Sequence, residues 1–261
     1  QEASNPFCVQ VVRSVCPTMS RGSHAVAAAV GAAAGVAAFA ALTRHLERRR
    51  YAETVRKAVV TRRSLFPRDL NGGDAPEAAI EAMLDAANWA PTHGKTEPWR
   101  FVVLRRRTGA IERLFNLAAA GSERWMKEGA EGQALQDLKK FLKKLPGKKK
   151  EIASASHVIM IVMKRQADPE KIMPEWEEMA ATACAVQNAH IVACAHDIAG
   201  YWSSGGVEGP WATTEVRSFL GLDEGDRCLG LFYLGLADGA RWMKMRGDAT
   251  RTSIADKVQW H

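Results

Sequence analysis

Seven consecutive residues, His157–Met163, form an almost uninterrupted apolar run that reads His-Val-Ile-Met-Ile-Val-Met. A run of this kind, without alternating polar residues, is typical of a strand buried in the centre of a sheet. Residues 228–234 have the same character, and shorter strand candidates lie at 99–104 and 198–202. Helical patterns are interspersed with these strands without a strict alternation. The sequence therefore predicts an α+β fold with a central mixed sheet flanked by helices.

The predicted helices differ in how their ends are marked. Asp74 can cap a helix that carries apolar residues through Ala87. Pro174 precedes a long helix over 175–196 whose first turn is acidic, as the helix dipole favours. The other predicted helices cover 51–63, 213–220 and a stretch from Thr108 towards Leu145 with a break at Gly121. Together these elements predict one folded domain over 51–261, which is long enough to fold without disulfides or metal.

Residues 25–42 carry no charge and consist almost entirely of small apolar side chains, eleven of which are alanine. As a helix they extend over about 27 Å, just enough to cross the hydrocarbon core of a bilayer. Gly31 and Gly35 have the spacing that lets membrane helices approach closely, and four arginines follow between residues 44 and 50. We interpret 1–24 as a tail and 25–50 as a single membrane-spanning helix with its basic flank.

Two alternatives for this segment stay open. An alanine-rich soluble helix fits its weak hydrophobicity, whereas a cleaved signal peptide fits poorly because the apolar run starts after residue 24. If the segment spans a membrane, the arginines place the folded domain on the cytosolic, stromal or matrix side. The first residue, Gln1, hints at a removed targeting peptide, so we expect a chloroplast or mitochondrial membrane. Cys8 and Cys16 would lie on its other side, where an oxidising compartment would allow a disulfide.

Seven lysines lie within residues 139–150, interrupted by Phe141, Leu142 and Leu145 and by a Pro146-Gly147 pair. Such a stretch can contact a membrane surface, a nucleic acid or a phosphorylated cofactor. No aromatic residues alternate with the lysines, as a base-stacking platform requires, so we expect no nucleic-acid partner. The simplest interpretation is a solvated helix end that runs into a turn at Pro146. The formal net charge of +7 allows an anionic partner without requiring one.

Several signatures of catalytic chemistry are absent from the sequence. It contains no Gly-x-Gly-x-x-Gly after a strand, no Walker loop, no His-Glu-x-x-His, no Cys-x-x-Cys and no Gly-x-Ser-x-Gly elbow. These absences argue against hydrolases and metalloenzymes, and we predict no metal ligands.

Three segments carry candidate binding residues. The first is Arg-Arg-Ser at 62–64, where two guanidiniums and a hydroxyl at a helix end suit a phosphate monoester. The second is a proline-stiffened loop over 89–101 that reads Trp-Ala-Pro-Thr-His-Gly-Lys-Thr-Glu-Pro-Trp-Arg-Phe. The third is Gly-Tyr-Trp-Ser-Ser-Gly at 200–205, where a strand ends in residues whose backbone N–H groups can face a ligand.

Together and in this order, the three segments resemble the flavin-dependent nitroreductase family. Arg-Arg-Ser resembles the family's phosphate-binding opening, and residues 90–101 resemble its loop, usually read Ala-Pro-Ser-x-x-Asn-x-Gln-Pro-Trp. The stretch 174–179 and the small-residue helix after it resemble the compact bacterial NAD(P)H nitroreductase branch, which has an Ala-Pro-x-His motif. Residues 229–235 resemble the family's last core strand. The similarity covers about residues 51–240 of the chain.

The resemblance implies an FMN-binding homodimer with each flavin in a cleft between protomers. The cofactor-binding residues that it implies are Arg62, Arg63, Ser64, His93, Lys95, Glu97, Trp202, Ser203 and Ser204. The first three would hold the ribityl phosphate, the last three would lie along the same flavin, and the loop that contains His93 would reach in from the other protomer. No catalytic side chain is implied, because the cofactor carries the hydride chemistry and the protein positions it.

Two positions depart from the family pattern. Lys95 and Glu97 stand where the family usually has Asn and Gln. A lysine near the N1/O2 edge of the flavin would favour its anionic reduced form, whereas an ionised carboxylate would oppose that form and can only accept hydrogen bonds. Alternatively, the two side chains pair with each other.

Two functions are consistent with these observations. The first is a membrane-anchored FMN-dependent oxidoreductase that passes hydride from NADH or NADPH to a small electrophilic acceptor, such as a nitro compound or a quinone. The second is a nitroreductase-fold accessory subunit of a larger membrane complex, with reduced or no catalytic activity. The interpretation of 25–42 as a membrane span, the long N-terminal extension and the Lys95 and Glu97 substitutions motivate the second function.

Overall fold

The computed structural model describes residues 21–166, 168–204, 209–247 and 250–261, with side chains from Val36 onward. The chain divides into two units, Gln1–Lys57 and Ala58–His261, and each is described by itself. The second unit therefore begins later than the domain start predicted at residue 51.

Helix α1, Arg21–Thr61, is continuous, so the predicted helix at 51–63 is the end of α1 and not a separate element. Within the described part of the chain, no helix is long and apolar enough to cross a membrane. The structure therefore does not show the span predicted over 25–42, and the side chains of residues 25–35 lie outside those that it describes. Cys8 and Cys16, predicted to face the opposite compartment, lie outside the described residues.

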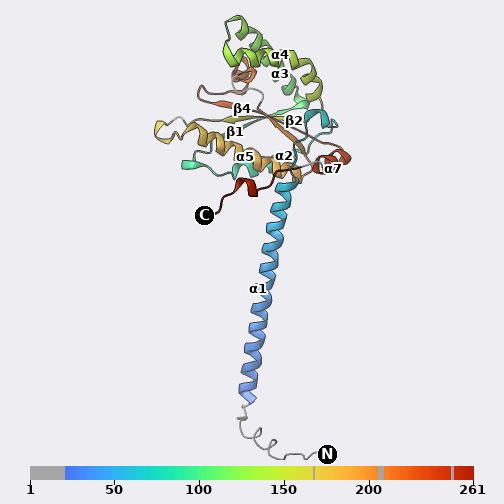
Figure 1. Ribbon diagram of the computed structural model, residues 1–261, viewed down its shortest axis with the longest axis vertical. Coiled ribbons are helices and arrows are strands. Elements are labelled where there is room, and N and C mark those ends of the chain that lie inside the picture. The colour runs from blue at the N-terminus through green and yellow to red at the C-terminus, as the bar shows by residue number, and fades with distance from the viewer. Residues whose placement is uncertain (1–20, 167, 205–208, 248–249) are drawn as a thin grey trace, which may run out of the picture. The chain divides into compact units, whose positions relative to one another are not determined.

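An antiparallel sheet of four strands forms the centre of the second unit (Figure 1). The strands follow the order β1-β2-β4-β3. They are β1 (Trp99–Arg105), β2 (His157–Met163), β3 (Ala199–Ser203) and β4 (Arg227–Gly235). All four lie where the apolar patterns predict them, and every residue of β2 is buried.

The prediction of a mixed sheet is wrong, since all three strand pairs are antiparallel. Among the described residues, parallel pairing occurs at one isolated bridge, between Ser64 and Gly200. The helical connections between the strands are long, so the sequence pattern alone leaves the strand directions open.

Helices cover both faces of the sheet (Figure 1). Helices α2 (Glu77–Asn88) and α5 (Glu175–Ala195) pack together on one face, while α3 (Ala110–Lys127) and α4 (Gly132–Ile152) cover the other. Helix α6 (Thr214–Leu220) packs against α3, and α7 (Gly239–Gly247) follows β4. Short turns of 3-10 helix lie at Pro67–Asp69, His93–Lys95, Arg106–Thr108, Pro169–Lys171, Pro210–Ala212 and Ala255–Lys257.

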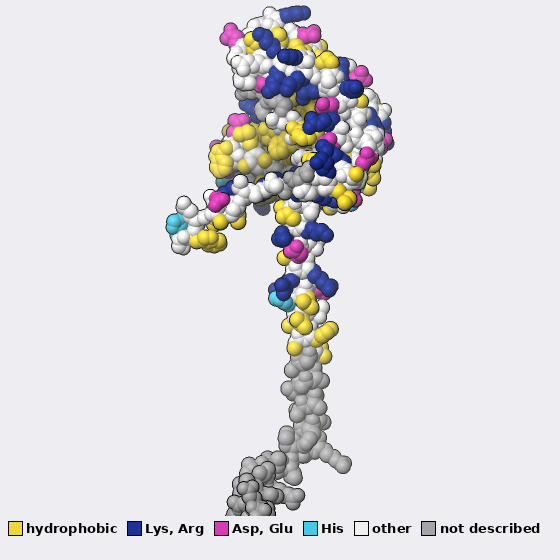
Figure 2. Space-filling view, turned by 45° about the vertical axis from the view of Figure 1, so that its right-hand side comes forward, with side chains coloured by type: hydrophobic (Ala, Val, Ile, Leu, Met, Phe, Trp, Pro, Cys, Tyr) yellow, Lys and Arg dark blue, Asp and Glu magenta, His cyan; other side chains and the backbone are white. Residues whose placement is uncertain are grey.

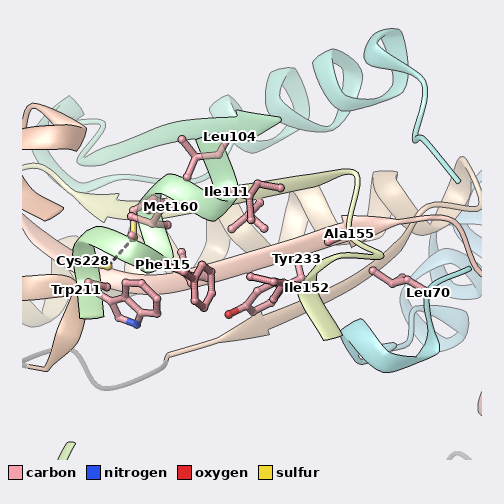
Figure 3. Packing of buried hydrophobic residues seen from close by; sticks show 14 of the residues in the cluster. Leu70, Leu104, Ile111, Phe115, Ile152, Ala155, Met160, Trp211, Cys228 and Tyr233 are labelled. Atoms are coloured by element: carbon pink, nitrogen blue, oxygen red, sulfur yellow. Dashed lines mark hydrogen bonds between the residues drawn. The ribbon is translucent and has the colours of Figure 1, made fainter. Parts of the chain in front are cut away.

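The alternation of side chains along β2 divides the core into two layers. Met160 and its alternate neighbours belong to the layer with α3 and α4, while Ile159 and Ile161 belong to the layer with α2 and α5. In the first layer, the Phe115 and Trp211 rings meet edge-on with their centroids 5.3 Å apart (Figure 3). A strand that is apolar on both sides needs both layers, which explains the helices on each face.

Three local predictions about helix ends are wrong. Gly121 does not break α3, because its missing side chain lets α3 approach Thr213 at the start of α6, where a Cβ would come within 2.7 Å. Helix α4 continues through Pro146 to Ile152 instead of ending in a turn. Asp74 does not cap α2, whose N-cap is Pro76. The Asp74 carboxylate forms an ion pair with Arg106 instead.

Candidate functional site

Arg62 follows α1 directly and lies beside α5. Its guanidinium lies 3.4 Å from the Oγ of Ser64 and 3.4 Å from the Nδ1 of His190. Among the described residues, no carboxylate forms an ion pair with Arg62. A guanidinium without an acidic partner is available for an anionic ligand.

His190 lies almost fully buried on α5, with 5% of its surface exposed. Its Nε2 lies 3.1 Å from the backbone oxygen of Arg63, which can only accept, so this nitrogen carries the proton and Nδ1 accepts from Arg62. Burial, and then the charge of Arg62, lowers the pKa of His190 to about 4. At neutral pH the imidazole is therefore uncharged and orients Arg62 without adding a positive charge.

The Arg63 side chain binds backbone oxygens. Its guanidinium donates to the carbonyls of Val60 (2.7 Å), Met245 (3.0 Å) and Arg246 (3.4 Å). These hydrogen bonds fasten the start of the second unit to the end of α7. Arg63 was predicted to bind a phosphate together with Arg62. In the structure its side chain holds two backbone segments together.

Two further arginines, Arg246 and Arg251, come from the C-terminal part of the chain. Burial, followed by the charges of Arg62, Arg251 and Arg246, lowers the pKa of Arg63. The charges of Arg62, Arg246 and Arg251 thus act on Arg63, and Arg63 also donates a hydrogen bond to the Arg246 carbonyl. We call Arg62, Arg63, Arg246 and Arg251 the arginine cluster. Arg246 and Arg251 were missed by the sequence analysis, and the basic residues scattered after β4 were the only signal for them.

The edge of the sheet joins the arginine cluster to the serine-rich end of β3. Ser64 forms a parallel bridge with Gly200, and the backbone N–H of Leu65 donates to the Gly200 oxygen at 3.0 Å. The indole N–H of Trp202 donates to the Leu229 oxygen at 3.0 Å, which fixes the ring against β4. Two of the predicted binding segments, far apart in sequence, therefore lie at one sheet edge.

Gly230 of β4 is the reason that β3 can end so close to β4. Its φ of +117° is in the region that favours glycine, and a Cβ there would overlap the Ser203 oxygen and lie 2.7 Å from the Cα of Ser204. The close approach sets the backbone course of the predicted flavin-contacting residues Ser203 and Ser204.

The second predicted segment is a strained loop beside α5. Gly94, Lys95 and Glu97 all have positive φ, of 58°, 55° and 44°. Strain of this kind gathers at binding sites, where the surrounding structure maintains it. His93 anchors one end of the loop, because its Nδ1 lies 2.5 Å from the Oε2 of Glu177 on α5.

Residues that the sequence analysis did not single out hold this loop. The Thr92 and Thr96 hydroxyls lie 3.0 Å apart, and the Thr92 hydroxyl accepts from the backbone N–H of Glu97 at 3.2 Å. The side chain of Gln166 donates to the Thr96 oxygen at 2.7 Å. Lys95 and Glu97 are exposed, and neither forms an ion pair or hydrogen bond through its side chain with another described residue. The alternative that they pair with each other is therefore wrong.

Within one chain, the structure brings together only two of the three predicted segments. No hydrogen bond or ion pair among the described residues links the loop at 93–97 to the arginine cluster. The expectation that this loop reaches the flavin of a second protomer stays a prediction.

The sequence model of the nitroreductase family matches residues 59–236, more than half of the chain. The chain belongs to the nitroreductase family. Two bacterial relatives, each named as a candidate NAD(P)H nitroreductase, support this assignment. YfhC of Bacillus subtilis is 29% identical over 192 residues, covering 74% of this chain and 89% of the relative. The protein from Haemophilus influenzae is 29% identical over 168 residues, covering 62% and 78%.

Solved structures show that the nitroreductase fold extends over most of the chain. A nitroreductase-like protein from Bacillus cereus superposes with a TM-score of 0.59 at 20% identity, covering 79% of this chain and 95% of its own. The FMN-dependent nitroreductase NfnB from Mycobacterium smegmatis, solved in complex with NADPH, gives a TM-score of 0.57 at 17% identity, covering 81% and 99%. At these identities the likeness supports the fold of residues 58–261.

Proposed function

We propose that this nitroreductase-family chain is an FMN-dependent oxidoreductase that passes hydride from NADH or NADPH to a small electrophilic acceptor, such as a nitro compound or a quinone. The observation that carries this proposal is the arginine cluster beside Ser64 at the edge of β3, where Arg62 forms no ion pair with any carboxylate that the structure describes. The names of the relatives, which include NAD(P)H nitroreductases and an FMN-dependent enzyme, support the same reaction class.

The residues present fit the phosphate end of FMN. A phosphate monoester carries close to two negative charges at neutral pH, and Arg62 with the neighbouring guanidiniums supplies matching positive charge. Ser64 adds a hydroxyl donor next to Arg62. His190, uncharged at neutral pH, holds the Arg62 guanidinium in place. When bound, FMN supplies the group that accepts and donates hydride.

The flat end of the cofactor would lie along Trp202, Ser203 and Ser204, where the close approach of β3 and β4 fixes the backbone. The exposed and unpaired side chains of Lys95 and Glu97 would then adjust the charge near the ring. Lys95 would favour an anionic reduced ring, and Glu97 would oppose it. Their balance would set the reduction potential and, with it, the range of acceptors.

We further propose a homodimer, with α5 at its interface. Trp176, Ala180 and Cys184 recur at helical spacing on the exposed side of α5, and 66% of the Trp176 surface is accessible. Together with Pro91 and His93 of the strained loop they line an open, mostly apolar hollow of about 410 Å³. An apolar surface of this kind, next to the predicted binding loop, suits a second copy of the chain.

The absorbance spectrum of the purified full chain tests the oxidoreductase proposal. We expect a flavin spectrum, recovered by adding FMN if the cofactor is lost, and NAD(P)H oxidation that depends on a quinone acceptor. A colourless protein that does not take up FMN would rule out the enzyme. A protein that binds FMN but oxidises neither NADH nor NADPH would instead favour the accessory-subunit function, which the Lys95 and Glu97 substitutions motivate.

The placement at an organelle membrane is a proposal that rests on the sequence. Its basis is the uncharged segment 25–42, with Gly31 and Gly35 able to pack against another helix, and the arginine-rich flank that would keep the folded domain in the stroma or matrix. Carbonate extraction of membranes tests it. Release of the intact chain into the soluble fraction would rule out a span, whereas retention that Gly31→Leu weakens would indicate packing through the glycines.

A further inference from the structure

A cavity of about 470 Å³ lies between the second half of α4 and the β3 edge of the sheet. Tyr201, Ser203 and Tyr233 line it from the sheet, and Lys143, Lys144 and Lys148 line it from α4. Tyr201 and Tyr233 belong to the core layer of α3 and α4, whereas the His190 ring packs on Phe232 in the opposite layer. The cavity therefore lies on the α3 and α4 side of the sheet, where Phe66 and Pro67, just after the Arg62–Ser64 segment, also line it.

Lys148 lines the cavity beside Lys143 and Lys144 because α4 does not stop at Pro146. The helix continues to Ile152, so Lys144 and Lys148, four residues apart, lie on the same side of it. Lys and Arg side chains gather over the upper part of the folded unit in Figure 2, where α4 lies in Figure 1. The turn expected at Pro146 is therefore replaced by continuous helix, on which Lys143 and Lys144 are exposed and Lys148 is half-buried.

These lysines lack partners in the part of the chain that the structure describes. Lys143, Lys144 and Lys148 form no ion pair or hydrogen bond through their side chains with another described residue. Lys148 is half-buried, and burial, followed by the charge of Lys144, lowers its pKa. The acidic side chain in the lining is Glu151, which forms no ion pair with them. Positive charges placed together at this cost favour an anion between them.

Hydroxyl groups line the sheet side of the cavity. Those of Tyr201, Ser203 and Tyr233 form no hydrogen bond with another described residue. Burial raises the pKa of Tyr233, so its hydroxyl stays protonated and available as a donor. In Figure 3 the Tyr233 ring lies beside Ile152 at the end of α4. Ammonium and hydroxyl donors from two sides of one cavity match the several acceptor oxygens of a phosphate group.

We propose that this cavity binds a phosphorylated small molecule through its phosphate group, as a second phosphate site whose lysines do not belong to the arginine cluster. Its lysines are not among the predicted flavin contacts, although Ser203, which also lines the cavity, is one of them. Two sources of the phosphate share this chemistry: the 2′-phosphate of NADPH, which NADH lacks, and a free phosphate ester. The volume is in the range of known small-molecule sites.

Calorimetric titration of the full chain, saturated with FMN, tests the site with adenosine 2′,5′-bisphosphate as the probe and adenosine as its phosphate-free counterpart. We expect the bisphosphate to bind and adenosine to bind at least about tenfold more weakly. The triple variant Lys143→Gln, Lys144→Gln, Lys148→Gln should lower the bisphosphate affinity by about tenfold or more. The matched control Lys139→Gln, Lys140→Gln, Lys150→Gln removes the same charge from the same helix outside the cavity and should change it by less than about twofold.

A second variant, Tyr201→Phe, keeps the ring packing and removes one hydroxyl, so it should weaken binding by a few fold. Equal bisphosphate affinity in the wild-type chain and the cavity variant would overturn the proposal. Equal losses in the two triple variants would also overturn it, because they would show general electrostatic attraction. The flavin spectrum is recorded first, and a chain that binds no FMN is titrated without it, so failure of the proposed function is seen separately.

Steady-state kinetics distinguishes the two sources. If the cavity holds the 2′-phosphate of NADPH, the cavity variant should raise KM for NADPH by about tenfold and leave KM for NADH unchanged. If a free phosphate ester is the ligand, the ratio of the two KM values should not change, although the bisphosphate affinity still falls. Both results support a phosphate site at α4.

Discussion

The Arg62 guanidinium and the Nδ1 of His190 lie 3.4 Å apart, on segments separated by more than a hundred residues. Because Nε2 of His190 donates to the Arg63 carbonyl, Nδ1 presents a lone pair to Arg62. A neutral histidine thus orients the one arginine of the cluster whose side-chain partners are a hydroxyl and an imidazole. The arrangement separates two roles that the motif Arg-Arg-Ser leaves merged: Arg62 stays available for the proposed phosphate, and Arg63 binds backbone carbonyls.

This division of roles between Arg62 and Arg63 predicts different effects for substitutions at the two positions. Arg62→Gln should weaken FMN binding by about 1.5–3 kcal/mol, roughly 10- to 150-fold, because it removes a charge-assisted contact, and should leave the melting temperature of the apoprotein nearly unchanged. Arg63→Gln should lower the melting temperature, because it breaks hydrogen bonds to the Val60, Met245 and Arg246 carbonyls. Quenching of FMN fluorescence and thermal unfolding measure the two effects. Equal FMN affinity in Arg62→Gln and wild type would place the phosphate elsewhere.

The depressed pKa of His190 predicts a loss of stability in mild acid. Between pH 6.5 and about 4 the unfolded chain binds a proton that the folded chain excludes, so the free energy of unfolding falls as pH falls through this window. Below about pH 4 both states carry the proton and the loss is complete. The total is roughly 3 kcal/mol for a shift of this size. Urea unfolding at a series of pH values measures it.

His190→Gln removes the titrating group and should flatten the stability profile between pH 6.5 and 4. His196→Gln is the matched control, because His196 is exposed at the end of the same helix and should leave the profile unchanged. A wild-type profile that survives in His190→Gln would assign the acid sensitivity to another group.

Gly230→Ala should be strongly destabilising, by several kcal/mol, because its Cβ would overlap the backbone of Ser203 and the residue would keep a left-handed φ. Gly239→Ala provides the comparison, since nothing lies within 4 Å of its Cβ and its effect should stay within about 1 kcal/mol. Chemical denaturation of both variants tests the close approach of β3 and β4. Similar midpoints for the two would contradict it.

The exposed face of α5 predicts the effect of a charge at the proposed interface. Trp176→Glu should shift a dimer towards monomer, because it places a carboxylate in an apolar contact surface. Met243→Glu on α7, where the side chain is also exposed, should leave the association unchanged. Sedimentation equilibrium reads both outcomes. A wild-type chain that is monomeric at micromolar concentration would already exclude the dimer.

Local sequence patterns were sufficient where a single element carries its own signal. The apolar run of β2 predicted a strand with every residue buried, and the acidic first turn after Pro174 predicted α5 to within one residue of its end. The order of the three binding segments was enough to indicate the nitroreductase family, which the family model then matched over residues 59–236. These features depend on neighbouring residues or on the order of motifs along the chain, so they can be predicted from the sequence directly.

The patterns failed where packing between distant segments outweighs local preference. Pro146 usually ends a helix, yet α4 continues through it because Phe141 and Ile152, on either side, are buried in the same core layer. Gly121 does not interrupt α3 because α6 packs closely on it. The membrane span predicted over 25–42 stays a prediction, because the structure describes side chains only from Val36 onward.

The sequence by itself determined the strands, the main helices and the family, because hydrophobic period and motif order are written along the chain. The tertiary structure alone decided that the charges of Arg246 and Arg251 act on Arg63, that the Arg63 side chain binds backbone carbonyls, and that the lysines of α4 line a cavity with Tyr201 and Tyr233. These arrangements depend on which residues meet across the sheet, and no local pattern encodes a meeting of segments so far apart. Electrostatic sites arise from such meetings, because charge interacts through space and not along the chain.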